Sequence, residues 1–318
     1  MSVVYFICQQ MMYFVIPLTV VALAGMFSER SGVMNIALDG TMIIGAFCGA
    51  VFLNLTQDTW SGQGQFLCAM LIAAVAGMLF MALHAFASIN LNAAQTISGI
   101  SMNMIAPALA IFLARVLFGY QRVPYTNSFL IRSIPVLGDI PILGPMLFQN
   151  TYISTWIGIA IMIISQFVLY KTTFGLRLRA CGEYPEAASS VGINVRKFRW
   201  IGVLISGLLA GMGGIIFIVP TSNMFSGNVA AYGFLAIAVL VFGQWKPMRI
   251  FLSALIFGFA KTISSGYSGI PFLASLNISP YVYKIIPYAF TILMLVISSR
   301  NPQAPRAVGK PYVKGDKS

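Results

Sequence analysis

Apolar runs long enough to cross a lipid bilayer recur along the whole 318-residue chain. A helix needs about 20 mostly apolar residues to cross the hydrocarbon, within an observed range of about 17 to 25. Charged residues make up only 8% of the sequence, whereas a typical soluble domain has about 25%. So few charges cannot cover the surface of a soluble protein of this length. The sequence therefore predicts a membrane protein and excludes a soluble enzyme, a nucleic-acid-binding protein and a disordered chain.

The runs predict an all-α, polytopic membrane protein with about nine transmembrane helices, within a range of about eight to ten. They form a single domain over residues 1–318 and lie near residues 11–27, 35–55, 66–86, 97–117, 152–170, 201–219, 230–242, 250–263 and 285–297. The seventh and eighth runs are too short to cross alone. Each either extends into neighbouring polar residues or belongs to a broken helix that the other helices shield.

Basic residues predict the orientation, because loops rich in Lys and Arg stay in the cytoplasm. Six lie between the fifth and sixth spans, where we expect a cytoplasmic loop at 172–199, and five lie in a basic tail at 300–318. Four spans separate these two segments, so both are predicted on the cytoplasmic side. Counting back along the chain places the N-terminus outside.

One long outer loop is predicted at 121–150. It contains the pentad Ile-Pro-Val-Leu-Gly at 134–138 and, after Asp139, the similar pentad Ile-Pro-Ile-Leu-Gly at 140–144. Proline fixes φ and glycine permits tight reversals, so this segment is expected to be structured. It either caps helix ends or forms a docking surface for something delivered from outside.

A short pattern occurs twice, and it indicates an inverted repeat. Residues 35–40 and 228–233 both read Asn, a β-branched residue, Ala, two variable residues and Gly, and an apolar run follows each. Five spans separate the copies, and an odd number inverts the second copy relative to the first. Inverted repeats are common in transporters, with the substrate path at the repeat interface.

The sequence lacks the groups that catalysis or metal binding would need. His84 is the only histidine, and Cys8, Cys48, Cys68 and Cys181 show neither metal-ligand spacing nor a disulfide framework. There is also no glycine-rich phosphate-binding loop. We therefore expect no enzyme activity, no metal site and no cofactor in this chain, so that any ATP must be bound by another chain.

The basic loop contains the signals of a short helix at residues 185–191. Pro185 suits the first helical position, Glu186 lies where the helix dipole favours an anion, and Gly192 is placed to end the helix. Its small side chains would let the groove of a partner close around it. An amphipathic turn lying on anionic lipid headgroups is the alternative interpretation.

The loop at 174–195 resembles the ATPase-contacting loop of ABC-importer permeases, in the branch that includes ribose-type sugar and nucleoside permeases. Further motifs of this branch, and most closely of guanosine-type nucleoside permeases, are similar to residues 28–36, 92–99, 242–247 and 311–315. The chain departs from the usual pattern at Ala37, Asp39, Ala94 and Tyr184, where the family commonly has Gly, Glu, Asp and Asn.

The resemblance implies the permease subunit of an ATP-driven importer in the bacterial cytoplasmic (inner) membrane. A second related permease would enclose the path with it, a cytosolic ABC ATPase would use ATP and Mg, and an extracytoplasmic binding protein would deliver a nucleoside or simple sugar. Membrane lipid is a further partner, and nucleic acid is not. The residues that would couple the chain to the ATPase are Gly182, Glu183, Pro185, Glu186, Ala187, Ala188 and Gly192.

Polar residues at membrane depth are the candidates for the substrate path, although each could instead join one helix to another. They are Asn35, Gln95, Thr96, Asn103, Ser206 and Asn228. Because no acidic residue lies in the middle of a predicted span, the path suits a neutral solute. The alternative function is a self-sufficient secondary transporter or channel for a small neutral solute, for which the repeat and Lys261 are the evidence.

Overall fold

The protein is described here by a computed structural model, which covers residues 2–134, 138, 144–267, 279–298 and 303–312. Seven of its helices are long and apolar enough to cross a membrane. They are α1 (Ser2–Arg30), α2 (Leu38–Thr56), α3 (Gln63–Ala85), α4 (Gln95–Phe118), α5 (Ile153–Lys171), α8 (Val195–Thr221) and α10 (Pro247–Gly266). A polytopic helical bundle is thus confirmed, with seven spans by length and composition in the described residues. The predicted count of about nine is not confirmed.

Two further apolar helices coincide with the seventh and ninth predicted runs. They are α9 (Tyr232–Phe242) and α12 (Pro280–Ser298). α9 has only 11 residues and follows a non-helical stretch at 226–231, so the seventh run is a broken helix. α10 has 20 residues because it begins at Pro247, within the polar turn after α9. The eighth run therefore extends into neighbouring polar residues.

The connections carry short strands, so "all-α" describes the spans but not the loops. β1 (Val123–Pro124) pairs with β4 (Met224–Phe225), and β2 (Ile131–Ser133) pairs with β3 (Gln149–Thr151), both antiparallel. Two π-helical turns are η1 (Phe86–Asn90) and η2 (Gly144–Phe148). The predicted loop at 121–150 is therefore ordered where it is described. Most of its two pentads lies outside the described residues.

α8 forms the centre of the bundle, where it packs against α1, α2 and α3. Glycines allow the backbones to approach closely, as in many membrane helix pairs. A Cβ atom added to Gly45 on α2 would lie 2.3 Å from the carbonyl oxygen of Gly211 on α8. One added to Gly77 on α3 would lie 2.4 Å from the carbonyl oxygen of Gly207. Larger residues at these positions would separate the helices.

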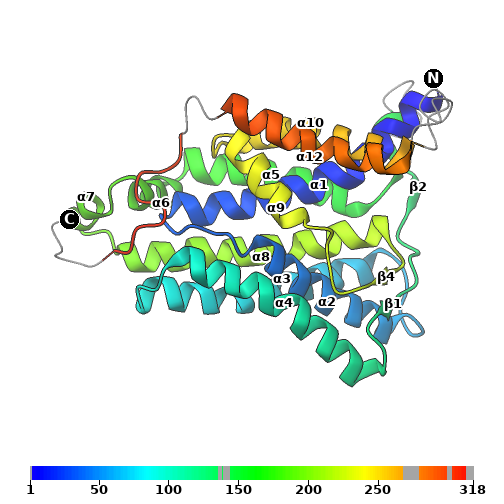
Figure 1. The fold of residues 1–318 in the computed structure, drawn as a ribbon, viewed down its shortest axis with the longest axis horizontal. Helices are drawn as coiled ribbons and strands as arrows, with labels where there is room; N and C mark the ends of the chain where they lie inside the picture. The colour runs from blue at the N-terminus through cyan, green and yellow to red at the C-terminus, as the bar shows by residue number, and fades with distance from the viewer. Residues whose placement is uncertain (1, 135–137, 139–143, 268–278, 299–302, 313–318) are drawn as a thin grey trace.

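α2 and α9 begin beside each other inside the bundle and run towards opposite ends (Figure 1). Each follows a non-helical segment, at 31–37 for α2 and at 226–231 for α9. The two copies of the repeated sequence pattern therefore meet at the starts of two helices. The opposite directions of the two helices agree with an inverted repeat, which stays a prediction.

The two ends of the bundle differ. The N-terminus and the short strands lie at one end, whereas α6 (Thr173–Glu183), α7 (Pro185–Ser190) and the segment at 303–312 lie at the other (Figure 1). The loop at 172–199 and the start of the tail thus lie at the same end of the bundle, and α1 begins at the opposite end. The side of the membrane on which each end lies stays a prediction.

Candidate coupling site and substrate path

α7 forms where the sequence predicts a short helix. Pro185 occupies its first turn together with Glu186. Gly192 follows the helix with a φ of 83°, which glycine adopts without strain, and its N–H donates to the carbonyl oxygen of Ser189 at 3.0 Å. Glu186 and Ala187 are exposed, so α7 presents a small, open surface at the end of the bundle.

Other predicted coupling residues anchor α7 to the bundle. Ala188 is buried in a small apolar cluster with Cys181 and Val195. Gly182 packs against the backbone of α1, because a Cβ atom there would lie 2.3 Å from the carbonyl oxygen of Arg30. Burial raises the pKa of the Cys181 thiol to about 11, an effect that the nearby guanidinium of Arg199 only partly offsets.

Glu183 connects α6 and α7 to the turn between α9 and α10. Its Oε1 atom lies 3.4 Å from Nη1 of Arg30. Nε and Nη2 of Arg30 donate to the carbonyl oxygen of Trp245, at 3.3 and 3.1 Å. Nε1 of Trp245 in turn donates to Oε2 of Glu29 at 2.6 Å. The sequence motifs at 28–36 and 242–247 contain Glu29, Arg30 and Trp245, but the sequence alone assigned no coupling role to these three side chains.

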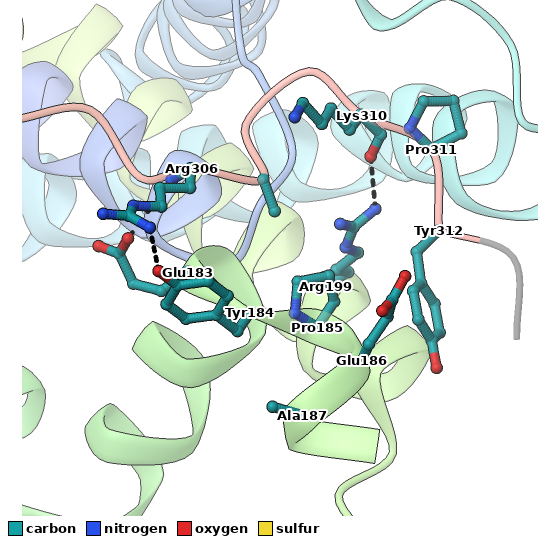
Figure 2. Close-up of a pocket in the computed structure, with 11 residues that line it drawn as sticks. Glu183, Tyr184, Pro185, Glu186, Ala187, Arg199, Arg306, Lys310, Pro311 and Tyr312 are labelled. Carbon is teal, nitrogen blue, oxygen red and sulfur yellow. Dashed lines mark hydrogen bonds between the residues drawn. The ribbon is translucent and has the colours of Figure 1, made fainter. Parts of the chain in front are cut away.

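The segment at 303–312, which we call the C-terminal segment, lies along the end of α6. The N–H of Ala307 donates to the carbonyl oxygen of Gly182 at 2.9 Å, and the N–H of Arg306 lies 3.4 Å from Oε2 of Glu183. The Arg306 side chain donates to the Tyr184 hydroxyl, and its guanidinium carbon lies 5.2 Å from the centre of that ring (Figure 2). The C-terminal segment therefore touches the residues that immediately precede α7.

Three of the predicted path residues hold the non-helical segment before α2. Nδ2 of Asn35 donates to Oγ of Ser206 at 2.7 Å. Oε1 of Gln95 accepts from the N–H of Met34 at 2.7 Å. Because α2 begins only at Leu38, these side chains supply partners for a backbone that lacks helical hydrogen bonds.

Asn103 and Thr96 also face this region, whereas Asn228 does not join it. Oδ1 of Asn103 accepts from the N–H of Gly40 at 2.7 Å, and Nδ2 donates to the carbonyl oxygen of Ile36 at 2.8 Å. Thr96 is exposed and donates to Sδ of Met34 at 3.6 Å. Asn228 is exposed in the segment before α9, where Oδ1 accepts from a backbone N–H two residues on.

Two polar atoms in this region are buried without a partner among the described residues. They are Oδ1 of Asn35 and Nε2 of Gln95, one acceptor and one donor. His84 lies beside them, with Nε2 3.1 Å from the carbonyl oxygen of Met34 and Nδ1 3.0 Å from Oγ of Ser98. Both unpaired atoms are enclosed within the bundle, and the side chains of Asn35, Gln95, Asn103 and Ser206 carry no fixed charge.

A bundle of apolar spans with a broken helix at its centre and a small helix exposed at one end is characteristic of a membrane transport subunit. The chain belongs to the family described as "Branched-chain amino acid transport system / permease component", whose model matches residues 7–295. It is therefore a membrane-spanning permease subunit of an ABC transporter.

Named relatives agree with this assignment. The chain is 43% identical to the guanosine ABC transporter permease protein NupQ of Bacillus subtilis, over 94% of this chain and 93% of that protein. It is 38% identical to the nucleoside ABC transporter permease protein NupC of Lactococcus lactis, over 97% and 96%. The nucleoside ABC transporter permease protein NupB of the same Lactococcus strain is 27% identical over 48% of this chain and 40% of that protein. No solved structure matches the chain.

These findings confirm two predictions from the sequence. The resemblance to nucleoside-type ABC permeases is correct, and so is the expectation that the chain is not an enzyme, because the family and the relatives are permease components. The roles of α7 and of the polar group near Asn35 stay predictions.

Proposed function

We propose that the chain is one of two permease subunits of an ATP-driven importer that carries nucleosides of the guanosine type into the cell. The observation that carries the cargo assignment is the 43% identity to a guanosine permease, which extends over almost the whole chain. A binding protein outside the cytoplasmic membrane would deliver the nucleoside. Two cytosolic ATPase subunits would bind ATP and Mg.

The polar group around the start of α2 suits such a cargo. A nucleoside is neutral and carries ribose hydroxyls and base edges that both donate and accept hydrogen bonds. Asn35 and Gln95 contribute an acceptor and a donor without partners among the described residues. Small-molecule sites are usually apolar with a few placed polar groups, and this region has that composition.

α7 is proposed to couple ATP hydrolysis to transport. Its exposed Glu186 and Ala187 would seat in the ATPase, while Gly182 and Glu183 join its base to α1 and to Arg30. Closure of the ATPase would then displace α6 and α7 together and change the contacts of Arg30 with Trp245. Since Trp245 follows α9, this displacement would reach the broken helix at the centre of the bundle.

A second, related permease subunit is proposed as the partner within the membrane. Lactococcus lactis has two nucleoside permease proteins that both resemble this chain, one at 38% and one at 27% identity. Two permeases of one strain that resemble this chain to different degrees support a heterodimer of this chain with a more distantly related permease. The substrate path would then lie between two different permeases.

Competition during uptake tests the cargo. The complete transporter, with its binding protein, is reconstituted in proteoliposomes that contain ATP, and entry of labelled guanosine is measured. We expect unlabelled nucleosides in tenfold excess to suppress entry, and ribose and glucose to leave it unchanged. Competition by ribose or glucose but not by nucleosides would show that the cargo is a sugar.

A further inference from the structure

A cleft of about 680 Å³ lies between α7 and the C-terminal segment (Figure 2). Tyr184 and Glu186 line it on the side of α7, and Lys310 and Tyr312 line it on the opposite side. Arg199, from the first turns of α8, lies between the two sides (Figure 2). The cleft thus adjoins the exposed surface of the proposed coupling helix.

The C-terminal segment is fixed at several points, so its side of the cleft is preformed. Ala307 is bonded to Gly182, as described above. Nη1 of Arg199 donates to the carbonyl oxygen of Lys310 at 3.0 Å. The guanidinium carbon of Arg199 lies 5.7 Å from the ring centre of Tyr312, which also packs against the apolar cluster of Cys181.

Two exposed charges at the cleft have no ion pair within the part of the chain that the structure describes. They are the ammonium group of Lys310 and the carboxylate of Glu186. The guanidinium of Arg199 adds a positive charge behind them, but it is only 2% exposed, and its unpaired Nε and Nη2 atoms are enclosed beside Gly32. An ammonium group without a partner favours an anionic acceptor.

We propose that this cleft is the second part of the ATPase docking site, and that a segment of the ATPase carrying a carboxylate enters it beside α7. The proposal rests on the proposed function. The carboxylate would accept a charge-assisted hydrogen bond from Lys310 near the positive charge of Arg199, and Glu186 at the rim would face a basic side chain. The C-terminal segment is thereby assigned a binding role that the loop at 172–199 alone does not supply.

The experiment measures how tightly the ATPase binds the purified permease pair. The probe is the ATPase subunit that co-purifies with the unaltered chain. Lys310→Glu reverses the charge of an exposed residue, so it should leave the fold intact while lowering the affinity at least tenfold. The matched control is Lys197→Glu, an exposed lysine on the first turn of α8 that does not line the cleft. We expect the control to change the affinity less than threefold.

Two further variants make the outcome decisive. Tyr312→Ala should weaken binding of the ATPase. Tyr312→Phe retains the ring over Arg199, so this variant should bind the ATPase as tightly as the unaltered chain does. Equal affinities for Lys310→Glu and Lys197→Glu would overturn the proposal. Ala187→Trp on α7 separates this proposal from the proposed function. If Ala187→Trp releases the ATPase and Lys310→Glu does not, the proposed role of the cleft is contradicted and the coupling role of α7 stands. If neither substitution releases the ATPase, the coupling role of α7 is contradicted as well.

Discussion

Oδ1 of Asp39, in the first turn of α2, accepts a hydrogen bond from the backbone N–H of Gly233, in the first turn of α9, at 2.9 Å. The two residues belong to the two copies of the repeated sequence pattern. A Cβ atom at Gly233 would lie 2.3 Å from Cα of Asp39, so no other residue type fits this approach without displacement. The contact joins the starts of α2 and α9, where the proposed substrate path begins.

Substitution of Asp39 tests that contact. Asp39→Asn retains an oxygen that can accept from Gly233, so uptake should fall less than threefold. Asp39→Ala leaves the N–H of Gly233 without its partner, which costs about 1–3 kcal/mol for a buried donor. We expect a lower thermal unfolding midpoint and at least tenfold slower uptake for the alanine variant. Equal behaviour of the two variants would contradict a role for this hydrogen bond.

Gly182→Ala should displace the base of α7. The new methyl group would meet the carbonyl oxygen of Arg30, and overpacking of this kind costs about 1–3 kcal/mol. Uptake and the thermal unfolding midpoint should both decrease. Gly266→Ala is the matched control, because its Cβ atom would be 3.6 Å from the nearest side chain, an ordinary contact. If Gly182→Ala left uptake and the unfolding midpoint unchanged, the close approach of Gly182 to Arg30 would not be required.

Trp245→Phe should destabilise the protein by removing one of the hydrogen-bond donors to Glu29. The Glu29 carboxylate is 7% exposed, and loss of a hydrogen-bond partner for a buried group costs about 1–3 kcal/mol. Adding Glu29→Gln removes the charge, so the double variant should be less destabilised than the sum of the two single changes. Unfolding midpoints of all four proteins form the double-mutant cycle. Additive effects would exclude a direct interaction between Trp245 and Glu29.

Thiol labelling tests the side on which α7 lies. Cys181 is fully buried and burial raises the pKa of its thiol to about 11, so a membrane-impermeant maleimide should react with it very slowly. A cysteine at the exposed position 190 (Ser190→Cys) should react rapidly in inside-out vesicles and not in intact cells. Rapid reaction in intact cells would place α7 outside and contradict the proposed coupling.

Features that depend on local sequence could be predicted, and long-range contacts could not. α7 was predictable because Pro185 and Gly192 act on their own neighbours. The short apolar run of α9 left two alternatives, a broken helix or an extension into neighbouring polar residues. The bond between Asn35 and Ser206 joins residues 171 positions apart, and no local signal indicates such a partner. Both residues were nevertheless selected, because polar side chains are rare at membrane depth.

The position of the C-terminal segment was not predictable either. Composition identifies residues 300–318 as a basic tail, which indicates only its side of the membrane. Its contact with Glu183 arises from tertiary packing across 123 positions of the sequence. Part of the tail lies outside the described residues, namely Val313 and Lys314 of the motif at 311–315 and the basic residues Arg300 and Lys317.

Accumulation of guanosine against a gradient tests the central claim most directly. The permease pair and binding protein are reconstituted in proteoliposomes with ATP on the side of α7, either with or without the ATPase. Guanosine should accumulate only when the ATPase is present, and Ala187→Trp should reduce accumulation at least tenfold while Lys197→Trp does not. Accumulation without any ATPase would show that the chain is a self-sufficient carrier and would contradict the account.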